Sequence, residues 1–94
     1  MNQPKFPLGQ IVATAGVAAR MEEYPTFQTG VMQSLHRHSQ CDWGDMDAED
    51  CQTNEAALVY GSRVMSDYTI DGIRIWIITE ADRSATTILF PDEY

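Results

Sequence analysis

The sequence predicts a single α+β domain, with two or three helices packed on one face of a three- or four-stranded antiparallel β-meander at the C-terminal end. Two observations predict this class. Apolar residues recur at helical spacing in the first part of the chain, and from Met65 onward the pattern changes to runs of β-branched and aromatic residues, which are typical of strands. A chain of 94 residues can build one small core, so residues 1–94 are one domain, with residues 1–7 expected to be mobile.

The chain is expected to begin with a short strand and a helix. Residues 11–13 form a β-prone apolar run and are the candidate fourth strand, at an edge of the sheet. Thr14 is a candidate N-cap for a helix over Ala15–Glu23, because its hydroxyl can accept a bond from a backbone N–H that the first turn leaves unpaired. Pro25 cannot continue a helix interior and is expected to end this helix.

A second helix is expected from a cap at Thr26 to about Ser39, after which turn formers replace the helical period. Its apolar residues fall at i, i+4 and i+8, with one more alongside, so they form one stripe over about three turns. We expect this stripe in the core, and its members are Phe27, Val31, Leu35 and Met32.

A third helix is predicted from Ala48 to about Val64. Asp47 followed by Asp50 resembles an N-cap with an acidic residue at N3, and Glu49 adds a negative charge where the helix dipole is positive. The side of this helix that is expected to pack inward is traced by Cys51, Leu58, Ser62 and Met65.

The C-terminal third predicts the meander. Ser66–Ile70 and Ile73–Glu80 are two strand-like runs joined by Asp71-Gly72, the dipeptide that most strongly favours a two-residue hairpin turn. The second run is β-branched or aromatic at almost every position and is expected to be central. Residues 81–84 make a second tight connection, and Ala85–Phe90 returns as the third strand.

Charge and composition limit the functions open to this chain. Fourteen Asp or Glu against six Lys or Arg give a formal net charge of −8, so the basic patch that binds nucleic acid or anionic lipid directly is missing. A hydrophobic fraction of 44% is too high for a disordered acidic tail. No signal-peptide or membrane-spanning run is present, which predicts a cytoplasmic protein. A basic protein surface is the partner that this charge favours.

Two motifs resemble a known group of proteins. The loop Asp42-Trp43-Gly44-Asp45 and the C-terminal block from Trp76 to Tyr94, which reads WIITEADRS-x-TTIL-x-P-x-x-Y, are similar to short proteins carried by plasmids and integrative elements. Such proteins are usually labelled "plasmid-related protein" and have no assigned activity. The resemblance implies a bacterial mobile genetic element as the genetic context and implies no catalysis.

The residues His36, His38, Cys41 and Cys51 are the candidate metal ligands, since zinc sites use imidazole and thiolate groups. Two histidines separated by one residue on a helix point about 200° apart, however, and the Cys-x9-Cys spacing is not that of a zinc knuckle. Polar histidines at a solvated helix end, with two free thiols, are the structural alternative. A Cys-His catalytic pair is disfavoured, because nearby Asp residues raise the pKa of a thiol.

Two further acidic groups have ordinary structural interpretations. The acids at 42, 45, 47 and 50 miss the spacing of a calcium-binding EF-hand loop, so Trp43 is interpreted as an anchor of the loop and Asp45 or Asp47 as a helix cap. Glu80 and Asp82 could serve acid–base chemistry but are expected to form a loop salt bridge with Arg83. No catalytic residue and no cofactor is predicted.

The leading hypothesis is a non-catalytic acidic interaction protein of a mobile genetic element. Six of the fourteen acids lie in residues 42–55, without any Lys or Arg, and could occupy the basic nucleic-acid-binding surface of a host defence complex, as an anti-CRISPR or anti-restriction inhibitor would. Tyr60 is a further candidate aromatic anchor. The expected partner-binding residues are Asp42, Trp43, Asp45, Asp47, Glu49, Asp50 and Glu55.

One interpretation of the acidity is that it only keeps the protein soluble. Two functional alternatives also remain open at this point. One is a small zinc-binding or metal-assisted enzyme that uses His36, His38, Cys41 and Cys51. The other is an oligomeric structural protein, for instance a homodimer, in which Trp76 and Ile78 on the exposed face of the meander make the contacts.

Overall fold

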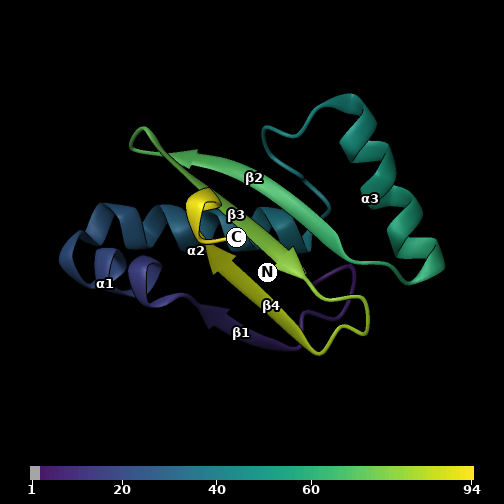
Figure 1. Ribbon diagram of the computed structural model, residues 1–94, viewed down its shortest axis with the longest axis horizontal. Coiled ribbons are helices and arrows are strands. Elements are labelled where there is room, and N and C mark those ends of the chain that lie inside the picture. The colour runs from purple at the N-terminus through teal and green to yellow at the C-terminus, as the bar shows by residue number, and fades with distance from the viewer. Residues whose placement is uncertain (1–2) are drawn as a thin grey trace.

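The computed structural model describes residues 3–94 and shows a four-stranded sheet with three α-helices (Figure 1). The strand order is β1-β4-β3-β2, antiparallel among β2, β3 and β4 and parallel between β1 and β4. The elements are β1 (Gln10–Ala13), α1 (Ala15–Glu23), α2 (Pro25–Ser39), α3 (Ala48–Tyr60), β2 (Val64–Ile70), β3 (Ile73–Thr79), β4 (Ala85–Leu89) and the 3-10 turn η1 (Pro91–Glu93). The predicted α+β class, meander and edge strand are confirmed, but the parallel β1 makes the sheet mixed.

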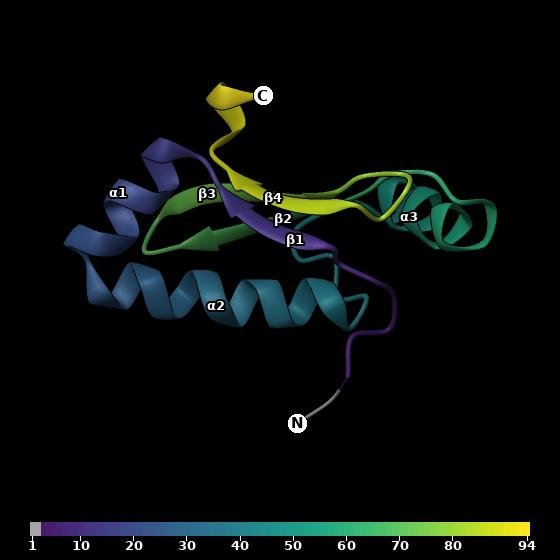
Figure 2. The ribbon, with the colours of Figure 1, turned by 90° about the horizontal axis from the view of Figure 1, so that it is seen from below.

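The three helices occupy different places around the sheet. α2 covers one face of the sheet, α1 lies beyond the ends of β1 and β4, and η1 stands on the other face (Figure 2). α3 instead lies beside β2, at the edge of the sheet opposite to β1 (Figures 1 and 2). The third helix therefore extends the molecule sideways and adds little to the layer that covers the sheet.

Local signals set most helix boundaries. α1 has the predicted bounds, and the Thr14 hydroxyl accepts the Val17 N–H at 3.3 Å. α2 begins one residue before the predicted cap, because Pro25 itself occupies the first helical turn after the N-cap residue Tyr24. α3 is shorter than predicted and stops at Gly61, which takes a left-handed conformation. None of the helices within residues 3–94 has the length and apolar character that crossing a membrane requires.

The predicted hairpin between β2 and β3 is confirmed. Ile70 pairs with Ile73 across the turn, and the two turn residues Asp71 and Gly72 have φ angles of 52° and 77°. Two successive positive φ angles define the tight turn whose twist matches that of the flanking strands. β3 lies between β2 and β4 and is therefore central, as expected.

The main core lies between the sheet and α2, with α1 at one end of it. Its buried members are Val17, Phe27, Val31, Tyr68, Ile70, Ile75, Ile77 and Ile88. The stripe predicted for α2 is wrong in part, because Met32 is 53% exposed and Leu35 only partly buried. Ser34 and His38 are buried on α2 in their place.

A smaller second cluster joins α3 to the rest of the molecule. It consists of Phe6, Trp43, Ala57 and Val64, with partly buried Leu8, Cys41, Met46, Cys51 and Leu58 around it. The inward side of α3 is thus centred on Asn54 and Ala57, and the predicted Ser62 and Met65 lie beyond the helix. Of residues 1–7, which were expected to be mobile, Met1 and Asn2 lie outside the described residues. Phe6 is buried in this cluster, and the Lys5 N–H donates to the Ser39 carbonyl at 2.8 Å.

The face of the sheet away from α2 is less open than predicted. Ile78, which was expected to be an exposed contact, is buried, and Trp76 is half-buried with its ring against that of Tyr94, 5.6 Å between centroids. The C-terminal tyrosine therefore covers the part of this face where an oligomer contact was expected.

Candidate functional site

The predicted acidic residues come from the loop before α3 and from α3 itself. Asp47 caps the helix as predicted, since its carboxylate accepts the Asp50 N–H at 2.8 Å. The first turn carries Glu49 and Asp50, and the last turn has no basic residue. A carboxylate at the N-terminus is favourable for the helix dipole, so the local sequence concentrates negative charge where the helix tolerates it.

Most of α3 is open to solvent. Asn54 and Ala57 are its buried residues, while Val59 and Tyr60 at its C-terminal end are 76% and 83% exposed. We call the accessible residues of this element the α3 surface: Asp47, Glu49, Asp50, Glu55, Val59 and Tyr60. It combines carboxylates with two large apolar side chains at one end.

Asp42 and Asp45 are held within the protein. Arg37 donates to both carboxylate oxygens of Asp42, at 2.7 and 3.1 Å, and this ion pair lowers the pKa of Asp42. The Thr69 hydroxyl donates to Asp45 at 3.2 Å. Both carboxylates therefore fix the loop against α2 and β2 and offer less free charge than α3 does.

Trp43 is 5% exposed and anchors the loop. Its indole N–H donates to Glu55 at 2.9 Å, and its ring lies near the rings of Phe6 and His38. This agrees with the structural interpretation of Trp43 and leaves no indole face for a partner. Tyr60, the other candidate anchor, is exposed.

No arginine of residues 3–94 forms an ion pair with the α3 surface. Within residues 3–94 the ion pairs are Arg37 with Asp42 and Arg74 with Asp67, and neither involves α3. Arg83 does not form the salt bridge expected with Glu80 or Asp82. Its guanidinium donates to the carbonyls of Ala57, Ser62 and Glu80 and so binds the C-terminal end of α3. Arg20 and Arg63 lie over the rings of Tyr24 and Tyr94.

His38 lies at the centre of a buried polar network. Its Nδ1 contacts the Ser66 hydroxyl and its Nε2 lies 2.9 Å from the Thr79 hydroxyl. Thr79 is 2.7 Å from the hydroxyl of Thr86, which donates to the Leu8 carbonyl at 2.7 Å.

The direction of each hydrogen bond in this network follows from the bond between the Thr86 hydroxyl and the Leu8 carbonyl. Because Thr86 donates to a carbonyl, it accepts from Thr79, and Thr79 in turn accepts from the protonated Nε2 of His38. Ser66 then donates to Nδ1, so the ring is neutral. Burial lowers the pKa of His38 to about 4.

The pair of Ser66 and His38 has the composition of a nucleophile and its base, but both residues are fully buried. No substrate can reach the hydroxyl without unfolding the site, and the ring donates its proton to Thr79 rather than to a carboxylate. The network is therefore structural.

The four candidate zinc ligands are not brought together. His36 is exposed, His38 is occupied by two hydroxyls, and Cys41 and Cys51 are free thiols. Across residues 3–94 no cluster of three His, Cys, Asp or Glu side chains could hold a metal ion. The pKa of Cys41 is raised, as expected, but burial is the main cause. The acidic neighbour that adds to it is Glu55, not Asp42, Asp45 or Asp47.

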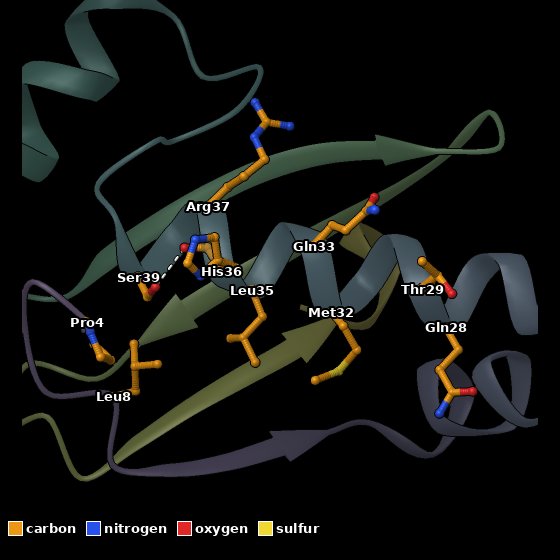
Figure 3. A pocket seen from close by; sticks show the side chains of 10 residues that line it. All are labelled: Pro4, Leu8, Gln28, Thr29, Met32, Gln33, Leu35, His36, Arg37 and Ser39. Carbon is orange, nitrogen blue, oxygen red and sulfur yellow. Dashed lines mark hydrogen bonds between the residues drawn. The ribbon is translucent and has the colours of Figure 1, made fainter. Parts of the chain in front are cut away.

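One hollow of the surface was not foreseen. A groove of about 800 Å³ runs along α2 toward the N-terminal segment. Leu8, Met32 and Leu35 contribute its apolar side chains, and Figure 3 shows Met32 and Leu35 leaving α2 on the side of β1. None of the residues that line the groove carries a carboxylate.

Sequence reasoning also missed Asn54 and the partners of His38. Asn54 is buried and bonds the Met65 backbone twice, accepting from its N–H at 3.1 Å and donating to its carbonyl at 2.7 Å. Nothing in a short helix distinguishes such an asparagine from a solvated one. Thr79 could have been found, because strand alternation puts it on the same face as Ile75 and Ile77.

Comparison with known proteins adds no assignment: no protein-family model, no curated protein and no solved structure matches this chain.

Proposed function

We propose that this protein is a non-catalytic interaction protein whose α3 surface binds a basic surface of a partner protein. The observation that supports the proposal best is an acidic helix whose carboxylates form no ion pair within residues 3–94. Its carboxylates are not paired with any of the arginines, and α3 projects from the edge of the sheet where a partner can approach it. Unpaired charges on one side of a molecule steer association with a surface of opposite sign.

The end of α3 supplies the apolar part of this contact. Tyr60 and Val59 are exposed at one end of the acidic stretch, and tyrosine is among the residues that contribute most to binding energy at protein interfaces. Charges on the helix would then set the approach of the partner, and Tyr60 would anchor it.

A nucleic-acid-binding protein is the partner class that this surface suits. Such proteins hold the phosphate backbone with Lys and Arg, and an acidic helix can occupy the same groups. Together with the resemblance to proteins of mobile elements, this favours a role as an inhibitor of a host defence complex of the CRISPR or restriction type.

The test is salt-dependent binding to a purified CRISPR surveillance complex and to a purified restriction complex. The Glu49→Gln, Asp50→Gln, Tyr60→Ala variant removes two charges and the anchor while leaving the Asp47 cap in place. We expect at least about tenfold weaker binding, and an affinity of the unchanged protein that falls as salt rises. The matched control Glu22→Gln, Glu23→Gln removes two charges from exposed positions on α1 and should bind as the unchanged protein does. Equal binding by both variants, or no binding to either complex, would overturn the proposal.

A further inference from the structure

One edge of the sheet is closed and the other is open. At the β2 edge, Asn54 bonds the Met65 backbone twice, and Gly44 forms a bridge to Asp67, whose N–H donates to the Trp43 carbonyl at 3.2 Å. At the β1 edge, no strand or bridge of residues 3–94 pairs with the outer side. Proteins generally protect an edge strand, because its unpaired backbone groups invite another strand.

The open edge is also apolar. Ile11 and Val12 in β1 are 44% and 39% exposed, on opposite faces of the sheet. Beside them, the groove along α2 presents Met32, which is 53% exposed, and the partly buried Leu35. β1 contains neither proline nor a charged residue, so the usual devices that block an edge are missing from it.

The outward backbone groups of β1 follow from its pairing with β4. The N–H groups of Gln10 and Thr14 donate to the Ser84 and Ile88 carbonyls, toward β4. In a strand the direction alternates, so the N–H and C=O groups of Ile11 and Ala13 point away from β4. A second antiparallel strand would find two donors and two acceptors there.

The distribution of charge favours a second copy of this chain at the β1 edge. The carboxylates of the α3 surface lie beyond β2, at the opposite edge of the sheet, and the groove beside β1 is lined without any carboxylate. The Glu93 carboxylate lies close to the end of β1, where it accepts the Thr14 hydroxyl at 2.8 Å. Two copies that meet at this edge nevertheless keep their α3 surfaces on the far sides of the two sheets, which limits the repulsion between two acidic chains. A two-fold axis there also lets the same apolar patch serve both sides of the contact.

We propose that two copies of this chain pair through β1, antiparallel across a two-fold axis, to form one continuous eight-stranded sheet. With the axis at Val12, Ile11 of one copy faces Ala13 of the second copy, and the outward groups of both strands exchange hydrogen bonds. Both α2 helices then lie on the same side of the sheet, so that Met32 and Leu35 of each copy close over the Ile11 side chains.

The groove is a necessary part of this interface. Stable protein interfaces bury roughly 1,200–2,000 Å² in total, and a strand of four residues cannot supply that area alone. The α2 side chains beside β1 add the apolar surface that backbone pairing lacks. Substitutions on β1 and on α2 should therefore both weaken the dimer.

The test is the mass of the full chain by sedimentation equilibrium, from low micromolar to several hundred micromolar. We expect a species of twice the 10.6 kDa of one chain. Ile11→Lys and Met32→Lys should each raise the dissociation constant at least about tenfold, because each copy would bring a charge into the apolar contact. Val59→Lys makes the same change at an exposed apolar site on α3 and should leave the constant unchanged.

Circular dichroism and thermal melting show whether each variant is folded, and Met32, exposed on a helix surface, gives a variant that does not depend on β1. A mass of one chain at every concentration would overturn the proposal. A dimer that both lysine variants leave intact would overturn it equally, because the contact would then lie elsewhere. Neither result bears on the α3 surface.

Discussion

Protonation of His38 should destabilise the protein at mildly acidic pH. The ring is fully buried between Ser66 and Thr79. It also packs against the aromatic rings of Phe6 and Trp43, with centroids 5.4 and 5.7 Å away. Protonation would put a charge into this site and would turn Nδ1 into a donor facing the Ser66 hydroxyl. Burial accordingly lowers the pKa of His38 from 6.5 to about 4.

The size and sign of the effect follow from this difference. The folded protein binds the proton more weakly than the unfolded chain, so stability rises with pH between about 4 and 6.5. The whole contribution is present above pH 6.5 and is lost as the pH falls toward 4. One pKa unit corresponds to about 1.4 kcal/mol, which makes the total about 3 kcal/mol. About 2 kcal/mol of this should be lost between roughly pH 7 and pH 4.5.

Urea unfolding across this pH range measures the effect. His38→Gln keeps a donor and an acceptor but does not titrate, so its free energy of unfolding should fall about 2 kcal/mol less than that of the unchanged protein. His36→Gln, on the exposed side of the same helix, is the matched control for the loss of one histidine. Equal slopes for the unchanged protein and His38→Gln would refute the reasoning, as would an NMR titration that places the pKa of His38 near 6.5.

Two further predictions concern the closed β2 edge. Asn54→Ala should lower the free energy of unfolding by about 2–3 kcal/mol, because it leaves the N–H and C=O of Met65 unpaired in a partly buried place. The exposed neighbour Thr53→Ala should change it by less than about 0.5 kcal/mol. Gly44→Ala should cost clearly more than Gly61→Ala, for which about 1 kcal/mol is expected. Both glycines have positive φ angles, but an added Cβ overlaps the Asp67 carbonyl at position 44 and meets nothing within 4 Å at position 61. Equal losses in either pair, measured by urea unfolding, would contradict the assigned contacts.

The parts of the fold that local chemistry determines were predictable from the sequence. Thr14, Asp47 and the dipeptide Asp71-Gly72 each act on backbone groups only a few residues away, and the helix starts and the hairpin lie where these signals place them. The parallel direction of β1 was not predictable. Three helices separate β1 from the strands, and a connection of that length can return on the sheet in either direction.

The face of α2 that packs inward illustrates a second limit. The spacing of Phe27, Val31, Ser34 and His38 is as helical as that of the predicted stripe, and hydrophobicity alone favoured Leu35 and Met32. The sheet determines which face of α2 packs inward, because it presents the hydroxyls of Ser66, Thr79 and Thr86 on the side of this helix. A helix residue opposite those hydroxyls has to hydrogen-bond, and His38 bonds two of them, those of Ser66 and Thr79.

The same limit applied to the candidate site. Asp42 and Asp45 cannot be distinguished from free surface residues in the sequence, since their partners Arg37 and Thr69 are set by the tertiary fold. The charges of α3 were predictable as a group, because a helix cap and its first turn are local. That these carboxylates form no ion pair within residues 3–94 was not predictable, because it depends on where the arginines lie in the fold.

On α2, His38 is buried and Met32 is exposed, although hydrophobicity alone would favour the reverse. This arrangement lowers the stability of the single chain and exposes apolar surface near the open edge. Placing a histidine inside and a methionine outside removes apolar burial worth about 1.5–3 kcal/mol from the single chain. The hydrogen bonds of His38 offset part of this loss, but they do nothing for the exposed surface of Met32 and Ile11. A second copy seated on β1 would cover that surface and recover its burial. The proposed dimer therefore accounts for the apolar groove beside α2 and for the unprotected edge of β1.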